Sequence, residues 1–291
     1  MAETPILIGL DGGGTSSRAA LRLGSGKRVD VIGGPANVSD FAGAMARIAH
    51  LLSHLAEAAG LPEAALRRAV AHVGLAGVMD GAMADRVAAR LPFARVTVTD
   101  DQPTTIAGAL GPDDGAVAAI GTGSFIGRQT GGRIRSVGGW GFALGDQSSG
   151  AWLGRRLLTE TLLAHDGIAP SSDLTRATLK RFGGAAGITA FGLNASPADH
   201  AALAPDIVAA ASAGDTVAGR LMGEGAAYID SATTVLGHGE GEPLCLVGGL
   251  GPAYGPWLLS THAARIIPPK GSALDGALAL ADRLAVMKEP R

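Results

Sequence analysis

Apolar residues along the chain follow two different periods, and the alternation between them predicts an α/β protein. Short apolar runs of strand length occupy residues 6–10, 19–23, 69–73 and 96–99. Between them, residues 41–59 repeat apolar positions at helical spacing, which predicts a helix. Ser39 or Asp40 would cap its start, and Gly60 would end it. A second helical stretch is expected over residues 82–90, so strands and helices alternate as in an α/β fold.

The same order of elements begins again near the middle of the chain. The runs over 6–10 and 19–23 are joined by the turn Asp11-Gly12-Gly13-Gly14-Thr15, and together they predict a hairpin. In the same way, an apolar run over 116–120 leads through Gly121-Thr122-Gly123-Ser124 into a second run over 125–128. The recurrence of strand, Gly/Thr turn and strand predicts two domains of related fold that are pseudo-duplicates of each other.

The second half of the chain carries further helical and strand patterns. A helix is expected from Ala151 to about Gly167, and another helical region over 207–236. An apolar strand over 244–247 leads into a third glycine cluster, and residues 274–287 form an amphipathic pattern typical of a last helix.

Length and composition fit a two-domain globular protein. The chain has 291 residues, of which 47% are apolar and 17% charged, and its formal net charge is −2. We expect an N-terminal domain over residues 1–112, with the C-terminal helix 274–291 packed on it, and a C-terminal domain over residues 113–273. The near-neutral charge excludes a nucleic-acid binder that works by bulk positive charge.

Cysteine content and the N-terminal sequence favour a cytoplasmic protein. Cys245 is the only cysteine, so the chain cannot form an intrachain disulfide or supply a Cys-rich zinc or iron–sulfur site. The first strand follows directly on Met1–Thr4, without a basic stretch or a long apolar region, and we therefore expect no signal peptide. No apolar window is long enough to span a membrane, so no membrane partner is expected.

The 45 glycines are concentrated in turns that follow apolar runs, where they can serve a ligand. The P-loop pattern and the Rossmann fingerprint are both absent, because the two early turns lead into strands. Consecutive glycines can still point backbone N–H groups into one concavity and bind phosphate, and two such turns facing each other would hold a polyphosphate. Asp11 beside phosphate requires a divalent cation, which predicts magnesium. The alternative is that each turn is merely tight.

Four segments together resemble the motifs of the N-acetylglucosamine kinase and BadF/BcrA ATPase family, within the actin/Hsp70/hexokinase superfamily. In chain order they are Asp11-Gly12-Gly13-Gly14-Thr15, Gly121-Thr122-Gly123-Ser124, Gly138-Gly139-Trp140-Gly141 followed by Asp146, and Val247-Gly248-Gly249. They span nearly the whole chain, and the segment around residues 145–168 is most similar to bacterial glucosamine kinases. The resemblance implies two ribonuclease H-like (actin-like ATPase) domains around a central cleft, with ATP and Mg²⁺ as cofactors.

The resemblance also implies roles for single positions. It assigns magnesium to Asp11, and the β- and γ-phosphates of ATP to Gly12, Gly13, Gly14 and Thr15. It assigns a second phosphate loop to Gly121, Thr122 and Gly123, and the adenosine to Gly214, Gly248 and Gly249. It assigns the sugar to Asn37, Gly139, Trp140, Gly141 and Asp146.

The catalytic base implied by the family is an aspartate that ends a strand before an alanine-rich helix, which here is Asp101 beside Asp100. Open α/β sheets bind ligands at the carboxyl ends of their strands, where this pair falls. Successive residues leave a strand in opposite directions, so only one of the two is expected to face the ligand. We favour Asp101 as the base and a capping or supporting role for Asp100.

Two positions keep a second interpretation at this stage. Asp146 either binds the sugar or caps the helix that begins near Gly150. Trp140 either stacks on a sugar ring or belongs to the core, and its flanking glycines favour the ligand.

The motifs predict an ATP-dependent kinase that phosphorylates the 6-hydroxyl of glucosamine, with N-acetylglucosamine close behind. A BadF/BcrA-type activating ATPase is the first alternative, but one cysteine is too few for its iron–sulfur cluster. A non-catalytic sugar sensor on the same scaffold is the second, although no helix-turn-helix precedes the first strand. A homodimer is common in such families, and the sequence leaves the oligomeric state open.

Overall fold

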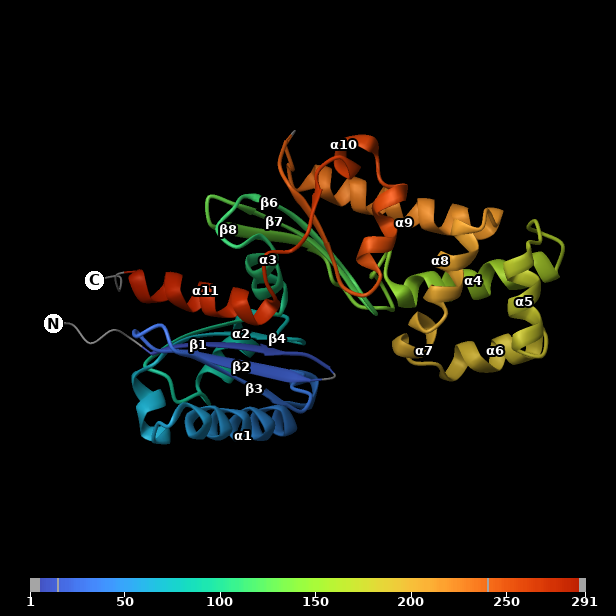
Figure 1. The fold of residues 1–291 in the computed structure, drawn as a ribbon. Coiled ribbons are helices and arrows are strands. Elements are labelled where there is room, and N and C mark those ends of the chain that lie inside the picture. The colour runs from blue at the N-terminus through green and yellow to red at the C-terminus, as the bar shows by residue number, and fades with distance from the viewer. Residues whose placement is uncertain (1–5, 15, 240, 288–291) are drawn as a thin grey trace. The chain divides into compact units, whose positions relative to one another are not determined.

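The computed structural model describes residues 6–14, 16–239 and 241–287. The chain divides into two compact units, of which the first comprises Met1–Asp113 with Pro269–Arg291 and the second Asp114–Pro268 (Figure 1). Each unit contains one five-stranded sheet with helices packed on it. No helix in the described part of the chain is both long and apolar enough to cross a bilayer.

The sheet of the first unit has the strand order β3-β2-β1-β4-β5. Its strands are β1 (Leu7–Gly12), β2 (Ser17–Arg22), β3 (Arg28–Gly33), β4 (Val70–Leu75) and β5 (Arg95–Thr99). β1 and β2 form the predicted antiparallel hairpin, while β4 and β5 run parallel to β1. The sequence analysis did not identify β3, an edge strand in which charged residues interrupt the apolar run. The carboxyl ends of β1, β4 and β5 therefore lie at one edge of the sheet.

The helix predicted over residues 41–59 is present as α1 (Phe41–Ala59). Asp40 caps its start by accepting the N–H of Gly43, and Gly60 ends it with a left-handed φ of 72°. The buried face of α1 includes Ile48, Leu51, Leu52 and Leu55, while Ala49 is exposed. The shorter elements of this unit are η1 (Val38–Asp40), η2 (Glu63–Arg68), α2 (Gly81–Ala88) and α3 (Gln102–Leu110).

The C-terminal helix α11 (Ala273–Val286) packs on β1 and against α3, on the sheet face opposite α1 (Figure 1). Glycines allow this close approach. A Cβ on Gly108 of α3 would lie 1.9 Å from the Ser272 carbonyl oxygen, and one on Gly276 would lie 1.9 Å from the Thr104 carbonyl oxygen. Since real Cβ atoms do not approach backbone so closely, the two helices can cross here only through glycine.

The second unit repeats the strand order of the first. Its sheet has the order β10-β9-β6-β7-β8, formed by β6 (Gly115–Ile120), β7 (Ser124–Thr130), β8 (Arg133–Gly138), β9 (Leu244–Val247) and β10 (Ile266–Ile267). As in the first unit, the first strand is central, pairs antiparallel with the second and parallel with the fourth. The predicted duplication is confirmed at the level of topology.

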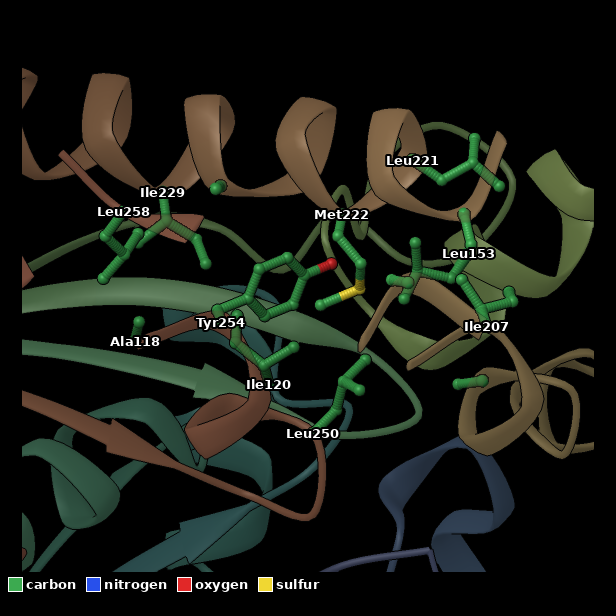
Figure 2. Close-up of a cluster of buried hydrophobic side chains, with 14 of the residues drawn as sticks. Ala118, Ile120, Leu153, Ile207, Leu221, Met222, Ile229, Leu250, Tyr254 and Leu258 are labelled. Carbon is green, nitrogen blue, oxygen red and sulfur yellow. The ribbon is translucent and has the colours of Figure 1, made fainter. Parts of the chain in front are cut away.

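The helices of the second unit are α4 (Gly150–His165), α5 (Asp173–Arg181), α6 (Ala185–Asn194), α7 (Pro197–Ala201), α8 (Ala204–Ser212), α9 (Thr216–Val235), η3 (Gly251–Trp257) and α10 (Ser260–Ala263). The helical region expected over 207–236 is present as two helices, because Gly214 adopts a φ of 88° and Asp215 caps a new helix, α9. The core lies between the sheet and α9, with Tyr254 at its centre (Figure 2).

Candidate active site

Asp11 and Asp101 lie at the same edge of the sheet in the first unit. Asp11 is the penultimate residue of β1, and Asp101 follows β5 at the start of α3. Burial raises the pKa of Asp11, and the charge of Asp101 raises it further, while Arg18 on β2 lowers it. Burial also raises the pKa of Asp101. Two carboxylates that repel each other in a half-buried site can be stabilised by a bound cation.

The side chains of Asp100 and Asp101 differ in their hydrogen bonds. The Asp100 Oδ1 accepts the backbone N–H of Gln102 at 3.2 Å, as a helix-capping carboxylate does. Asp101 occupies the N-cap position of α3, but its side chain makes no capping hydrogen bond. Its carbonyl oxygen instead accepts the hydroxyls of Thr104 and Thr105, both at 2.9 Å. The Asp101 backbone is thus held without using the carboxylate, which leaves that group for a ligand.

The first glycine turn is closely packed at one end and open to solvent at the other. A Cβ on Gly12 would lie 2.4 Å from the Leu75 side chain, and the Gly13 N–H donates to the Ser16 carbonyl at 2.9 Å within the turn. Gly14 is exposed, and a Cβ there would meet no atom within 4 Å. The backbone at Gly14 is therefore the part of this turn most open to a phosphate. Thr15 lies outside the described residues.

Asn37 has a structural task that the sequence analysis did not foresee. It is the N-cap of η1, and its Oδ1 accepts the N–H of Ser39 at 2.9 Å. A Cβ on Gly77 would lie 2.7 Å from the same oxygen. The acceptor end of the Asn37 amide is thus committed to the local fold, and its NH₂ group is the end that can reach a ligand.

The second glycine turn joins β6 to β7 and is tied to the start of α4. The Gly121 carbonyl accepts the N–H of Gly150 at 2.8 Å, and the Thr122 carbonyl accepts that of Ala151 at 3.2 Å. Within the turn, the Gly121 N–H donates to the Gly123 carbonyl at 2.9 Å. The Thr122 side chain is exposed. The turn is therefore fixed by its carbonyl groups, while the Thr122 hydroxyl remains accessible from solvent.

Asp146 lies next to this second turn in an uncommon backbone conformation. Its φ is 59°, and that of Ser148 is 73°. The left-handed region costs a non-glycine residue roughly 1–2 kcal/mol. Asp146 is 8% exposed, and a Cβ on Gly123 would lie 3.0 Å from its carboxylate. Burial raises the pKa of Asp146, and backbone hydrogen bonds from Ser124 and Gly141 oppose this shift.

The helix-cap alternative for Asp146 is wrong. The cap of α4 is Ser149, whose hydroxyl oxygen accepts the N–H of Trp152 at 3.1 Å. The core alternative for Trp140 is also wrong, because this residue is 71% exposed. Gly139 and Gly141 flank it with positive φ values of 74° and 83°. The loop thus presents an aromatic face to solvent close in sequence to a buried carboxylate.

The glycines assigned to the adenosine differ in their surroundings. Gly248 has a φ of 84°, and a Cβ there would lie 2.4 Å from the Ile120 carbonyl oxygen. Because Ile120 directly precedes Gly121, Gly248 lies beside the second glycine turn. A Cβ on Gly249 would meet no atom within 4 Å. Gly214, with a φ of 88°, forms the break between α8 and α9.

His72 is a buried polar residue near the site that the sequence analysis missed. Its Nε2 lies 3.2 Å from the Thr99 Oγ1, which in turn donates to the Asp100 carbonyl at 2.7 Å. Burial lowers the pKa of His72 to about 4, so the ring is neutral at physiological pH. The sequence signal for His72 is a histidine in the middle of an apolar run of strand length. In the structure this run is β4, which lies between β1 and β5.

The residues present fit a magnesium ion held together with phosphate. Within residues 6–14, 16–239 and 241–287, no cluster of three or more His, Cys, Asp or Glu side chains could hold a metal alone. Mg²⁺ is commonly bound by one or two carboxylates, with substrate phosphates and water completing its octahedron. Asp11, with Asp101 beside it, supplies that number of carboxylates. His50 and His54 on α1 are exposed, as expected for a solvated helix face.

Comparisons with known proteins agree on one group. The model of the BadF/BadG/BcrA/BcrD ATPase family matches residues 8–255. Glucosamine kinase GspK of Vibrio cholerae is 33% identical over 284 residues, which is 95% of each chain. A provisionally assigned N-acetylglucosamine kinase of Chromobacterium violaceum has a solved structure with a TM-score of 0.82 and 35% identity, over 96% of this chain and 99% of that one.

A more distant structure supports the fold alone. The ROK family glucokinase of Streptomyces griseus, solved with glucose and AMPPNP, has a TM-score of 0.51 and 18% identity, over 96% of this chain and 99% of the glucokinase. Its similarity covers both units, so the two repeated sheets are those of a two-domain actin-like ATPase fold.

Proposed function

The chain belongs to the BadF/BadG/BcrA/BcrD ATPase family, and we propose that within it the protein is an ATP-dependent amino-sugar kinase. It transfers the γ-phosphoryl group of ATP to the 6-hydroxyl of its substrate. Glucosamine is the first candidate substrate and N-acetylglucosamine the second, since relatives of similar identity carry either name. Family membership alone does not distinguish a kinase from an activating ATPase, and the distinction rests on the site residues.

The pairing of Asp11 with Asp101 is the observation that carries the proposal. Phosphoryl transfer to an alcohol needs a group that accepts the hydroxyl proton and a cation that neutralises the phosphates. Asp101 has a carboxylate free of capping bonds and a pKa raised by burial, which makes it a stronger base than an exposed aspartate. Asp11 is close enough for the charge of Asp101 to raise its own pKa, and it is the residue proposed to hold magnesium.

In the proposed mechanism, Asp101 accepts the proton of the sugar 6-hydroxyl while the hydroxyl oxygen forms a bond to the γ-phosphorus. The bond from the γ-phosphorus to the bridging oxygen breaks, and ADP leaves. Bound magnesium supplies charge neutralisation at the phosphate oxygens. The backbone at Gly14 and the hydroxyl of Thr122 are proposed to bind phosphate. Thr104 and Thr105 hold the Asp101 backbone in place during the proton transfer.

The sugar and the adenosine are proposed to bind the remaining residues. Asp146 would accept hydrogen bonds from sugar hydroxyls, the NH₂ group of Asn37 would donate one, and Trp140 between Gly139 and Gly141 would cover the ring. Gly248 and Gly249 lie at the end of β9 beside the second glycine turn, where a nucleotide bound to that turn would extend. Gly214 remains a proposed lining residue of the same pocket.

Two other functions on this scaffold are less well supported. An activating ATPase of this family would need thiolates for its cluster, and the single cysteine, Cys245, is fully buried in β9. A non-catalytic sugar sensor would have no need of a buried base aligned beside a second carboxylate. We also propose that the protein acts in the cytoplasm, and that a homodimer is its first candidate assembly.

A coupled ADP-release assay tests the proposed function. The protein is assayed with MgATP and, separately, glucosamine, N-acetylglucosamine, N-acetylmannosamine and glucose. We expect ADP release to depend on an amino sugar, and the product to be the 6-phosphate by NMR. Sugar-independent ADP release would favour an ATPase, and sugar binding without turnover in calorimetry would favour the sensor.

A further inference from the structure

The turn that carries Asp146 is held in place by three side chains of the second unit, and one of them reaches it from the hydrophobic core. We propose that Tyr254 is a positioning residue for sugar binding, because its hydroxyl holds the turn 146–148 in the conformation that aims the Asp146 carboxylate. The inference rests on the proposed function, in which Asp146 binds the sugar.

Three hydrogen bonds converge on this turn from different elements. The Tyr254 hydroxyl of η3 donates to the Ser148 carbonyl at 2.7 Å. The Ser148 hydroxyl donates to the Gly225 carbonyl of α9, also at 2.7 Å. The Ser124 hydroxyl at the start of β7 donates to the Gln147 carbonyl at 2.6 Å. The turn is thus fixed against the sheet, α9 and η3 at once.

The backbone of the turn needs such support. Asp146 and Ser148 both have positive φ values although neither is glycine. Strained conformations of this kind persist only where the surrounding structure determines them, and they are concentrated at functional sites. Without the three hydrogen bonds, residues 146–148 would relax toward ordinary backbone angles, and the Asp146 side chain would turn with them.

Tyr254 is suited to fix the turn because it cannot move. It is fully buried, and Figure 2 shows its ring among core side chains with the hydroxyl directed away from the sheet. A Cβ on Gly225 would lie 2.4 Å from the tyrosine oxygen, so α9 provides room for this hydroxyl only by having glycine there. The same glycine accepts the Ser148 hydroxyl. One set of contacts therefore supports the Asp146 turn, and it links Gly225, Ser148 and Tyr254.

The test compares Tyr254→Phe with Thr161→Val in the full-length enzyme. Both substitutions remove one buried hydroxyl of the second unit. The Thr161 hydroxyl, however, donates to the Leu157 carbonyl at 2.8 Å within α4, about three turns from the start of that helix, and it does not hold the Asp146 turn. We expect Tyr254→Phe to raise the KM for glucosamine about threefold to tenfold, the effect of one lost hydrogen bond, and to change the KM for ATP less than twofold. Thr161→Val should change neither. Ser148→Ala, which removes a different bond to the same turn, should reproduce the Tyr254→Phe pattern.

A double-mutant cycle separates positioning from general destabilisation. If Tyr254 acts through Asp146, Tyr254→Phe should raise the KM for glucosamine no further once Asp146→Ala is present. Full additivity, or equal changes in the two KM values, would overturn the inference. The proposed function is tested separately by the wild-type enzyme, whose failure to phosphorylate amino sugars would not depend on Tyr254. Hydrogen exchange at residues 145–149 reports the loosened turn independently of activity, and it should be faster in Tyr254→Phe and Ser148→Ala but unchanged in Thr161→Val.

Discussion

Replacement of Asp101 by asparagine should make the enzyme slower and the fold more stable at the same time. Asn keeps the size of the side chain but cannot accept the hydroxyl proton. The Asp101 backbone is held by Thr104 and Thr105 through its carbonyl, and those bonds survive the change. The loss is therefore that of the base alone, a fall in kcat of roughly 10²–10⁴, which corresponds to about 3–5 kcal/mol in the barrier. Both KM values should stay within a few-fold.

The gain in stability follows from the direction of the pKa shifts. The pKa values of Asp11 and Asp101 are raised above 3.8 in the folded protein. The folded state therefore binds more protons than the unfolded state just above that pH, and stability is lost as the pH rises through the raised values. Burial opposes ionisation of both carboxyl groups, and the charge of Asp101 opposes that of Asp11 as well. Removing one of the two ionisable groups should therefore raise the Tm at pH 7, and the gain should disappear below pH 3.8.

The assay measures initial rates and thermal denaturation on the same samples, with Asp100→Asn as the matched control. Asp100 accepts the backbone N–H of Gln102, and Asn keeps an oxygen that can accept it, so this replacement should leave kcat within about tenfold. Burial and the charge of Asp101 also raise the pKa of Asp100, so the Tm should rise in this variant too, and kcat alone distinguishes the two. A fall in kcat that comes with a fall in Tm would mean that Asp101→Asn merely damages the fold. If Asp100→Asn is the slow variant, the two roles are reversed, and if neither is slow, the base lies elsewhere.

Four further predictions concern other residues. Asp11→Asn should raise the magnesium concentration for half-maximal activity by about tenfold or more, and an unchanged magnesium titration would remove Asp11 from the metal site. Asp146→Ala should raise the KM for the amino sugar about tenfold with little change for ATP, and equal changes would indicate a structural role. Gly276→Ala should lower the free energy of unfolding by about 1–3 kcal/mol in urea, whereas Gly223→Ala, where a Cβ meets no atom within 4 Å, should not lower it. The pKa of His72 is about 4 in the folded protein against 6.5 in the unfolded chain. The free energy of unfolding therefore falls as the pH drops from 6.5 to 4, and His72→Gln should remove about 3 kcal/mol of that fall.

The sequence was sufficient for the elements whose signals are local. The helix α1 was predicted with its capping residue and its stop, because Asp40 and Gly60 act through their own backbone neighbourhood. The duplication was predicted because the same short order of strand, turn and strand occurs twice. The sequence interpretation did not divide the helical region at Gly214, although Gly214 and the capping residue Asp215 mark the break locally. The edge strand β3 was missed because its charged residues hide the apolar alternation.

The sequence indicated candidate site residues, but not the residues whose hydrogen bonds hold them in place. Asp101 and Asp146 were identified from motifs, yet nothing near them in sequence indicates Tyr254, which is 106 residues beyond its partner Ser148. The capping task of Asn37 was missed because it depends on the short helix η1 that follows. Hydrogen bonds between distant segments leave no periodic pattern in the sequence, so the groups that hold a candidate site residue are found only in the folded chain.

The packing of α11 on β1 and α3 has a consequence for biosynthesis. The ribosome completes residues 114–268, an entire unit, before it makes the helix that finishes the first unit. Until then the surface of α3 around Gly108 lacks α11, the helix that packs against it, and so does the segment that begins with Asp101. The half of the protein synthesised first is thus the last to be completed, and a chain released short of α11 would carry the proposed base on an unfinished scaffold. Activity therefore requires the synthesis of α11, which follows that of the whole second unit.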